Sequence, residues 1–168
     1  MWYSVVSTLM GWVGILASPR GIRRLTIPCG SRDLAYTDLI STSHSIAPEP
    51  SLGRLSDIER RIERYLSGRR TFFPDTLDLI GTPFQIEAWE LVRTIPWGET
   101  RSYAWVASNI GRPRAFRAVG QVMRSNPAAF LVPCHRVIGK DGKLCGYGGT
   151  EGLGMKSKIL AIELDSRN

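Results

Sequence analysis

Two short helical patterns joined by a glycine-containing turn constrain the fold of this chain most. Ser102 is a suitable N-cap for a helix over residues 103–110, and Gly111 and Arg112 then predict a tight turn. Pro113 is suited to the first turn of a second helix that reaches about residue 125. Two short helices with such a turn are typical of a helix-turn-helix.

The second predicted helix is both amphipathic and basic. Its apolar face is predicted to consist of Ala115, Val119, Val122 and Met123. Six arginines and no acidic residue lie between positions 101 and 136. Residues 82–168 hold 12 basic and 7 acidic side chains, a net of +5, whereas residues 1–81 hold 10 and 8, a net of +2. A solvated basic face is the simplest interpretation, but this concentration on a helix-turn-helix pattern favours a polyanion partner.

The first half of the chain predicts a small antiparallel sheet with a helix. Residues 3–6, 12–17 and 21–28 are short β-favouring segments separated by turn residues, and 42–53 is a polar loop. Ser56 and Glu59 form a capping-box pattern, which opens a helix that Gly68 ends. The apolar segment from residue 5 to 17 is interpreted as strand, not as a signal peptide or membrane span.

The second half predicts a mainly helical domain. After a linker over 73–81, Thr82 is the expected N-cap and Pro83 the first residue of a helix that reaches about residue 94. Beyond Pro127 the backbone is expected to be extended through 130–132, and a last helix spans 155–164. The fold class is therefore α/β, of the α+β type, with an N-terminal domain over 1–78 and a winged-helix-like helix-turn-helix domain over 79–168.

Cys134 lies directly before His135, one of only two histidines in the chain. A thiol with a pKa of roughly 8.5 is mostly protonated at neutral pH, and a neighbouring imidazole can remove its proton. A buried structural cysteine is the alternative interpretation. A zinc site needs about four closely spaced ligands, which Cys29, Cys134, Cys145 and two histidines do not offer. Three cysteines without a pairing pattern indicate a reducing compartment, and we expect a cytoplasmic protein.

Several motifs in order resemble the O6-alkylguanine-DNA alkyltransferases, also called methylated-DNA–protein-cysteine methyltransferases. The resemblance covers about residues 82–163 and is weak before them. It is carried by Tyr103, residues 114–120, Asn126-Pro127, residues 133–136, Gly146-Tyr147 and Glu163. It implies repair of O6-alkylguanine, and more weakly of O4-alkylthymine, in duplex DNA by irreversible, stoichiometric transfer of the alkyl group to Cys134. It also implies a monomer that needs no cofactor and no membrane.

The resemblance further assigns three catalytic roles. Glu163 would orient His135, and His135 would deprotonate Cys134 through a water, in a relay like that of hydrolases. A surface salt bridge is the alternative for Glu163, and Arg136 is assigned a structural role.

The resemblance also assigns the DNA surface and the substrate pocket. Arg117 would enter the base stack in the minor groove and Tyr103 would help to turn the nucleotide outward, because a buried thiol cannot reach O6 in stacked DNA. Arg112 and Lys140 complete the predicted DNA-binding set. The predicted pocket and hinge residues are Asn126, Val137, Tyr147 and Gly148.

This sequence departs from the family at some positions. Gly148 replaces a serine found in many members and leaves only a backbone N–H to donate to O6. Cys145 stands where members often have a small residue, and Ala129 stands where some members have proline. Some members bind zinc in the N-terminal domain, but Cys29 and His44 alone predict no metal here.

Two other function classes compete with alkyl transfer. A damage-binding protein of the same fold lacks the reactive cysteine, and Cys134 opposes that interpretation. A transcriptional regulator would carry an added cysteine-rich domain and would bind one promoter sequence.

Overall fold

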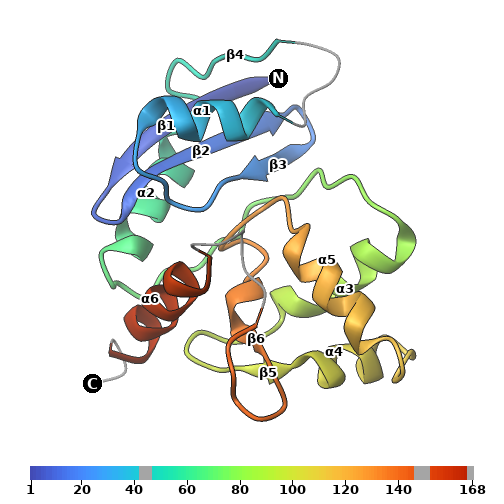
Figure 1. The fold of residues 1–168 in the computed structure, drawn as a ribbon. Coiled ribbons are helices and arrows are strands. Elements are labelled where there is room, and N and C mark those ends of the chain that lie inside the picture. Colours follow the sequence, from blue (N-terminus) through green and yellow to red (C-terminus); the bar gives the residue numbers. More distant parts are fainter. Residues whose placement is uncertain (42–46, 146–151, 166–168) are drawn as a thin grey trace. The chain divides into compact units, whose positions relative to one another are not determined.

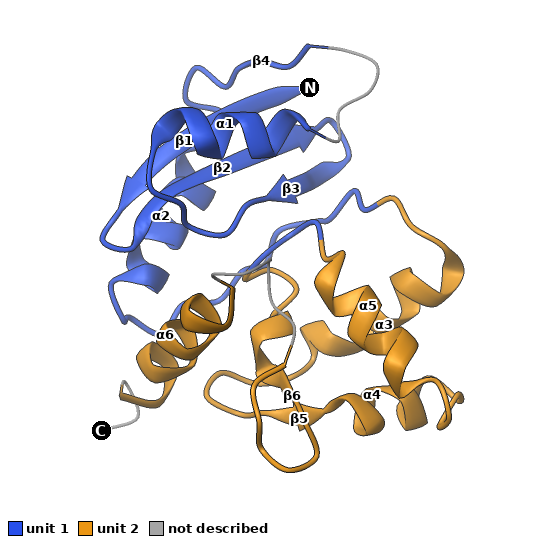
Figure 2. Cartoon of the chain, viewed as in Figure 1, with its two compact units in different colours: residues 1–79, 127–129 blue, residues 80–126, 130–168 orange. Residues whose placement is uncertain are grey.

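The computed structural model describes residues 1–41, 47–145 and 152–165, and the chain divides into two units (Figure 2). Unit 1 comprises Met1–Leu79 together with Pro127–Ala129. Unit 2 comprises Ile80–Asn126 and Phe130–Asn168. The chain therefore leaves unit 2 after Asn126, adds a short segment to unit 1, and returns to unit 2 at Phe130.

Unit 1 is built on a four-stranded sheet in the order β3-β2-β1-β4 (Figure 1). Strands β1 (Trp2–Thr8), β2 (Gly11–Ser18) and β3 (Gly21–Leu25) form the predicted antiparallel hairpins. The sheet is mixed rather than purely antiparallel, because β4 (Glu49–Pro50) pairs in parallel with β1. The prediction of a loop over 42–53 was wrong at this strand, since two residues with a proline carry no strand pattern. Proline is tolerated there because β4 is an edge strand.

Two helices pack on the sheet of unit 1. Helix α1 (Arg32–Ile40) lies against the face that includes Gly14, and α2 (Ser56–Leu66) lies on the other face (Figure 1). Strand β2 is accordingly buried along most of its length. Sequence reasoning did not predict α1, because only Ala35 and Leu39 of that helix are buried.

Unit 2 is mainly helical, as predicted. Trp89 lies in its core, and its Nε1 donates to the Val122 carbonyl at 3.1 Å. The pair β5–β6 is parallel. The elements of this unit are α3 (Pro83–Arg93), β5 (Arg101–Ser102), α4 (Tyr103–Asn109), α5 (Phe116–Arg124), the 3-10 helix η1 (Cys134–Arg136), β6 (Val137–Ile138) and α6 (Gly152–Asp165).

Helices α4 and α5 form the predicted helix-turn-helix and pack with α3 (Figure 1). Ser102 caps α4 by accepting from the Trp105 N–H, and Gly111 takes the left-handed φ of +71° that the turn requires. The second helix begins at Phe116, so the predicted start at Pro113 was wrong. Residues 112–115 instead form a turn, in which the Ala115 N–H donates to the Arg112 carbonyl at 2.8 Å.

The approach to the cysteine also differs from prediction. An extended backbone over 130–132 was expected, but Phe130 has a φ of +68° and residues 129–131 form a turn. Such a conformation costs a non-glycine residue on the order of 1 kcal/mol and persists only where packing enforces it. Phe130 is 3% exposed, which supplies that packing. No helix in the described parts of the chain is long and apolar enough to cross a membrane.

Candidate active site

Cys134 is the first residue of η1 and is buried. Its N–H donates to the Val132 carbonyl at 2.7 Å, which closes a tight turn around Pro133. Asn126 binds the same turn from the end of the helix-turn-helix. Its Nδ2 donates to the Val132 carbonyl at 2.8 Å and to the Cys134 Sγ at 3.0 Å. Asn126 therefore links the end of the basic helix to the thiol, and its role as a hinge stays a prediction.

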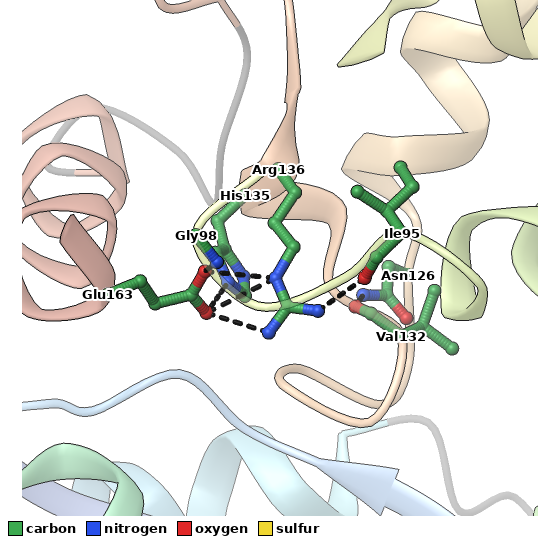
Figure 3. A network of polar contacts seen from close by, with 7 residues as sticks. All are labelled: Ile95, Gly98, Asn126, Val132, His135, Arg136 and Glu163. Carbon is green, nitrogen blue, oxygen red and sulfur yellow. Dashed lines mark hydrogen bonds and ion pairs between the residues drawn. The ribbon is translucent and has the colours of Figure 1, made fainter. Parts of the chain in front are cut away.

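Glu163 of α6 is the centre of a buried polar network (Figure 3). His135 Nε2 lies 2.9 Å from Oε1 of this carboxylate. Arg136 donates from Nε at 3.0 Å to Oε2 and from Nη2 at 2.8 Å to Oε1. The Gly98 N–H donates to Oε2 at 3.0 Å, and Arg136 Nη1 also donates to the Ile95 carbonyl at 2.6 Å. Arg136, assigned only a structural role from sequence, is thus a direct partner of the carboxylate.

This network fixes the charge of Glu163 and the orientation of His135. Burial by itself raises the pKa of Glu163, but hydrogen bonds from His135 and Arg136 outweigh it and hold that pKa well below its usual range. An ionised carboxylate accepts only, so Nε2 of His135 carries a proton when the ring is neutral. Nδ1 is then the ring nitrogen with the basic lone pair.

Burial sets the protonation states of the Cys134 thiol and the His135 ring. It raises the pKa of Cys134, although the Asn126 hydrogen bond and the Lys156 charge oppose the shift. Burial also lowers the pKa of His135, against the effect of Glu163. At neutral pH the Cys134 thiol is therefore protonated, and the ring of His135, the next residue in the chain, is neutral. The thiol needs a base to become a nucleophile, and the histidine is in the form that can accept a proton.

Lys156 of α6 is a buried cation that sequence reasoning missed. Its Nζ donates to the Val137 carbonyl at 2.6 Å, to the Cys145 carbonyl at 3.0 Å and to the Tyr103 hydroxyl at 3.4 Å. Burial lowers the pKa of Lys156, while Cys134 and Cys145 raise it. One signal was available in the sequence. Lys156, Ile159 and Glu163 are spaced by three and four residues, so they lie on one face of the helix. A buried face that contains Ile159 and Glu163 therefore also contains Lys156.

Tyr103 completes the polar wall on this side of the site. Its hydroxyl donates to the Cys145 carbonyl at 2.8 Å, and its ring centroid lies 5.7 Å from Lys156 Nζ. Burial, followed by the charges of Cys145 and Cys134, raises the pKa of Tyr103 to about 12. The phenol is therefore a neutral hydrogen-bond donor at physiological pH. The carbonyl of Val137, a predicted pocket residue, uses one lone pair for Lys156 and retains a second.

The other predicted site residues lie outside this polar cluster. Arg112 and Arg117 are exposed on the helix-turn-helix, with their guanidinium groups 5.1 Å from the Phe84 ring and 5.9 Å from the Phe116 ring. Lys140 is exposed in the turn after β6. Tyr147 and Gly148 lie outside the described residues, as does His44. Among the residues that the structure describes, no group of three or more His, Cys, Asp or Glu side chains could hold a metal ion.

Comparison with known proteins links this geometry to one family. A family model described as "6-O-methylguanine DNA methyltransferase, DNA binding domain" matches residues 83–164. A methylated-DNA–protein-cysteine methyltransferase of Methanosarcina barkeri is 35% identical over 164 residues, 97% of either chain. One from Mycobacterium tuberculosis is 48% identical over 114 residues, 68% of either chain. The crystal structure of Mycobacterium tuberculosis OGT in complex with DNA has a TM-score of 0.80 and 34% identity, covering 99% of this chain and 94% of that one.

Proposed function

Because the chain belongs to the methylated-DNA–protein-cysteine methyltransferase family, we propose that it repairs O6-methylguanine in DNA by transfer of the methyl group to Cys134. The observation that carries the choice of Cys134 is its burial beside the His135–Glu163–Arg136 network. Cys145 is exposed and Cys29 is half-buried in unit 1. Neither has a histidine beside it in sequence.

The reaction begins with removal of the Cys134 proton. His135, oriented by Glu163, accepts it at Nδ1 through a bridging water, and the Lys156 charge favours the thiolate that forms. The sulfur then attacks the methyl carbon. A sulfur–carbon bond forms as the bond between this carbon and O6 breaks, and the electron pair stays with guanine. The Tyr103 hydroxyl would give its proton to O6 of the leaving base, and Lys156, which donates to this hydroxyl at 3.4 Å, would stabilise the resulting phenolate.

The product defines the stoichiometry. A thioether is chemically stable, so nothing regenerates the thiol and each protein molecule would react once. No cofactor is required, because the lesion itself supplies the methyl group. A nucleophile that must stay a free thiol fits the reducing cytoplasm.

Access to O6 requires that the alkylated base leave the helix. Flipping a base costs a few kcal/mol, which contacts to the surrounding DNA must offset. We assign those contacts to the exposed basic side chains Arg112, Arg117 and Lys140. Tyr147 and Gly148 remain candidates for the pocket wall, on the basis of the sequence alone. Alkyl groups larger than methyl, and O4-alkylthymine, would enter the same site, and the protein would act as a monomer.

Intact mass tests the proposal. We would incubate wild type, Cys134→Ala and the control Cys145→Ala with duplex DNA that carries one O6-methylguanine. The expected result is a gain of one methyl group on Cys134 in wild type and in Cys145→Ala, with saturation at one per protein, and no gain in Cys134→Ala. Tight binding to the lesion without mass gain in wild type would instead indicate a damage-recognition protein and would overturn alkyl transfer.

A further inference from the structure

Phe116 is an apolar side chain that the functional site does not use. It is the first residue of α5 and is 45% exposed. A single exposed apolar residue is ordinary on a protein surface. Phe116 differs from such a residue in its position, because it begins the second helix of a helix-turn-helix. It lies between two arginines in the sequence, Arg114 and Arg117.

The helical spacing places Phe116 beside the residues assigned to DNA. Val119, Val122 and Met123 face the core of unit 2, so Arg117 and Arg124 project from the opposite side. Phe116 lies one turn before Gly120, at the edge of this exposed side. A Cβ on Gly120 would lie 4.0 Å from Cε1 of the Tyr103 ring. The edge that carries Phe116 therefore continues toward Tyr103, whose hydroxyl accepts from Lys156 at 3.4 Å.

The charges around the ring indicate what it contacts. The guanidinium of Arg117 lies 5.9 Å from the Phe116 centroid, and no acidic residue occurs from position 101 to 136. An aromatic ring with cationic side chains around it is complementary to a partner that has an anionic surface and a stack of planar apolar groups inside. Duplex DNA has this construction. Proteins that distort duplexes insert apolar wedges, phenylalanine among them, between base steps.

We propose that Phe116 is a wedge that inserts between base pairs next to the alkylated guanine, alongside Arg117. This inference rests on the proposed function and extends its DNA contacts by an apolar one. The ring would stack on a base exposed when the lesion leaves the helix, and the arginines would neutralise the phosphates on either side. Stacking of an aromatic side chain on a base stabilises a complex in a way that salt does not screen.

The salt dependence of binding separates the wedge from an electrostatic contact. In a Cys134→Ala background, which prevents repair, Phe116→Ala should weaken binding to an O6-methylguanine duplex by about tenfold at every salt concentration. The slope of log affinity against log salt should not change. Arg114→Ala should instead make that slope shallower by about 0.9, the value for one phosphate contact. Phe116→Leu should retain most of the affinity, because it preserves an apolar wedge.

Base unstacking provides the second measurement. A 2-aminopurine next to the lesion should brighten when the Cys134→Ala protein binds, and Phe116→Ala should lose most of that signal at saturating protein. Phe72→Ala is the matched control, since Phe72 is 79% exposed in unit 1 and should affect neither measurement. Unchanged affinity and unchanged fluorescence in Phe116→Ala would overturn the wedge. A loss of affinity that came with a changed salt slope would overturn it as well.

The wedge and the proposed function can fail separately. Wild-type protein would also be incubated with the free nucleobase O6-methylguanine, which needs no base flipping, and its mass measured. If the wild-type protein gains mass but Phe116→Ala changes neither affinity nor fluorescence, only the proposed wedge is rejected. Absence of mass gain from both the free base and the duplex would reject alkyl transfer, whatever the binding data show.

Discussion

The reactivity of Cys134 depends on a balance between burial and nearby charge. Burial raises the pKa of the thiol, whereas the Asn126 amide and the Lys156 ammonium lower it. Each of these two groups comes from a different segment of the chain. Asn126 follows the helix-turn-helix, and Lys156 lies on α6, the helix that also carries Glu163. This helix thus contributes a cation near the sulfur and an anion beside the histidine.

Replacement of Lys156 by methionine tests its electrostatic role. Loss of the positive charge should raise the Cys134 pKa further, so less thiolate forms at a given pH. Alkyl transfer at pH 7 should slow by roughly tenfold or more, and the pH–rate profile should move to higher pH. Single-turnover rates across a pH series measure both effects.

A control on the same helix makes this test specific. Lys158 is exposed on α6, and Lys158→Met should leave the rate and the profile unchanged. Lys156 also holds the Val137 and Cys145 carbonyls, so its loss could disturb the pocket. A rate that fell equally at all pH values would mean that Lys156 only maintains structure.

Capping residues predicted a helix start correctly where the side chain binds the backbone of its own helix. Thr82 accepts from the Gln85 N–H while the Gln85 side chain accepts from the Thr82 N–H, so α3 has a full capping box at the predicted cap. The same pattern failed at α2. There Leu55 is the N-cap, and the Ser56 hydroxyl donates backward to the Gly53 carbonyl at 2.9 Å. A serine in a turn has both options, and only tertiary context selects one.

Elements that depend on distant partners carried no such signal. Strand β4 exists because the Glu49 N–H donates to the Met1 carbonyl and the Ser51 N–H to the Tyr3 carbonyl. The left-handed Phe130 is likewise set by packing, not by its own preference. In the candidate site, adjacent Cys134 and His135 were visible in sequence. The bidentate Arg136–Glu163 contact was not, because it joins residues 27 positions apart.

Asp78 ties the segment after α2 to the sheet of unit 1. Its carboxylate accepts from Ser18 at 2.7 Å and from Arg23 at 2.9 Å, and Arg20 lies at 3.1 Å. We expect Asp78→Ala to lower the free energy of unfolding by about 1–2 kcal/mol, because the part-buried Ser18 and Arg23 donors lose their acceptor. Asp57→Ala is the control, with an expected change of about 0–1 kcal/mol, since Asp57 and Arg60 form an exposed pair. Urea unfolding followed by tryptophan fluorescence measures both, and equal effects would contradict the role of Asp78.

At the scale of the whole molecule, the basic charge should control DNA affinity. The net charge is +7, and a net of +5 falls in residues 82–168. Each neutralised phosphate releases counterions, so affinity should fall steeply as salt rises. Arg124→Ala, on α5, should make the log–log slope shallower by about 0.9, whereas Arg64→Ala, exposed on α2, should not change it. Titrations over a salt series provide the slopes, and identical slopes for the two variants would place the DNA surface elsewhere.

The segment Pro127–Ala129 has a practical consequence for anyone who would shorten this protein into a labelling tag. Leu25 of β3 donates to the Pro127 carbonyl at 2.8 Å and accepts from the Ala129 N–H at 3.0 Å. A gene fragment for residues 80–168 would encode every side chain of the proposed site but would omit Leu25. A minimal tag therefore needs one of two additions. Either β3 is supplied as a separate peptide, or residues 127–129 are redesigned so that their backbone groups find other hydrogen-bond partners.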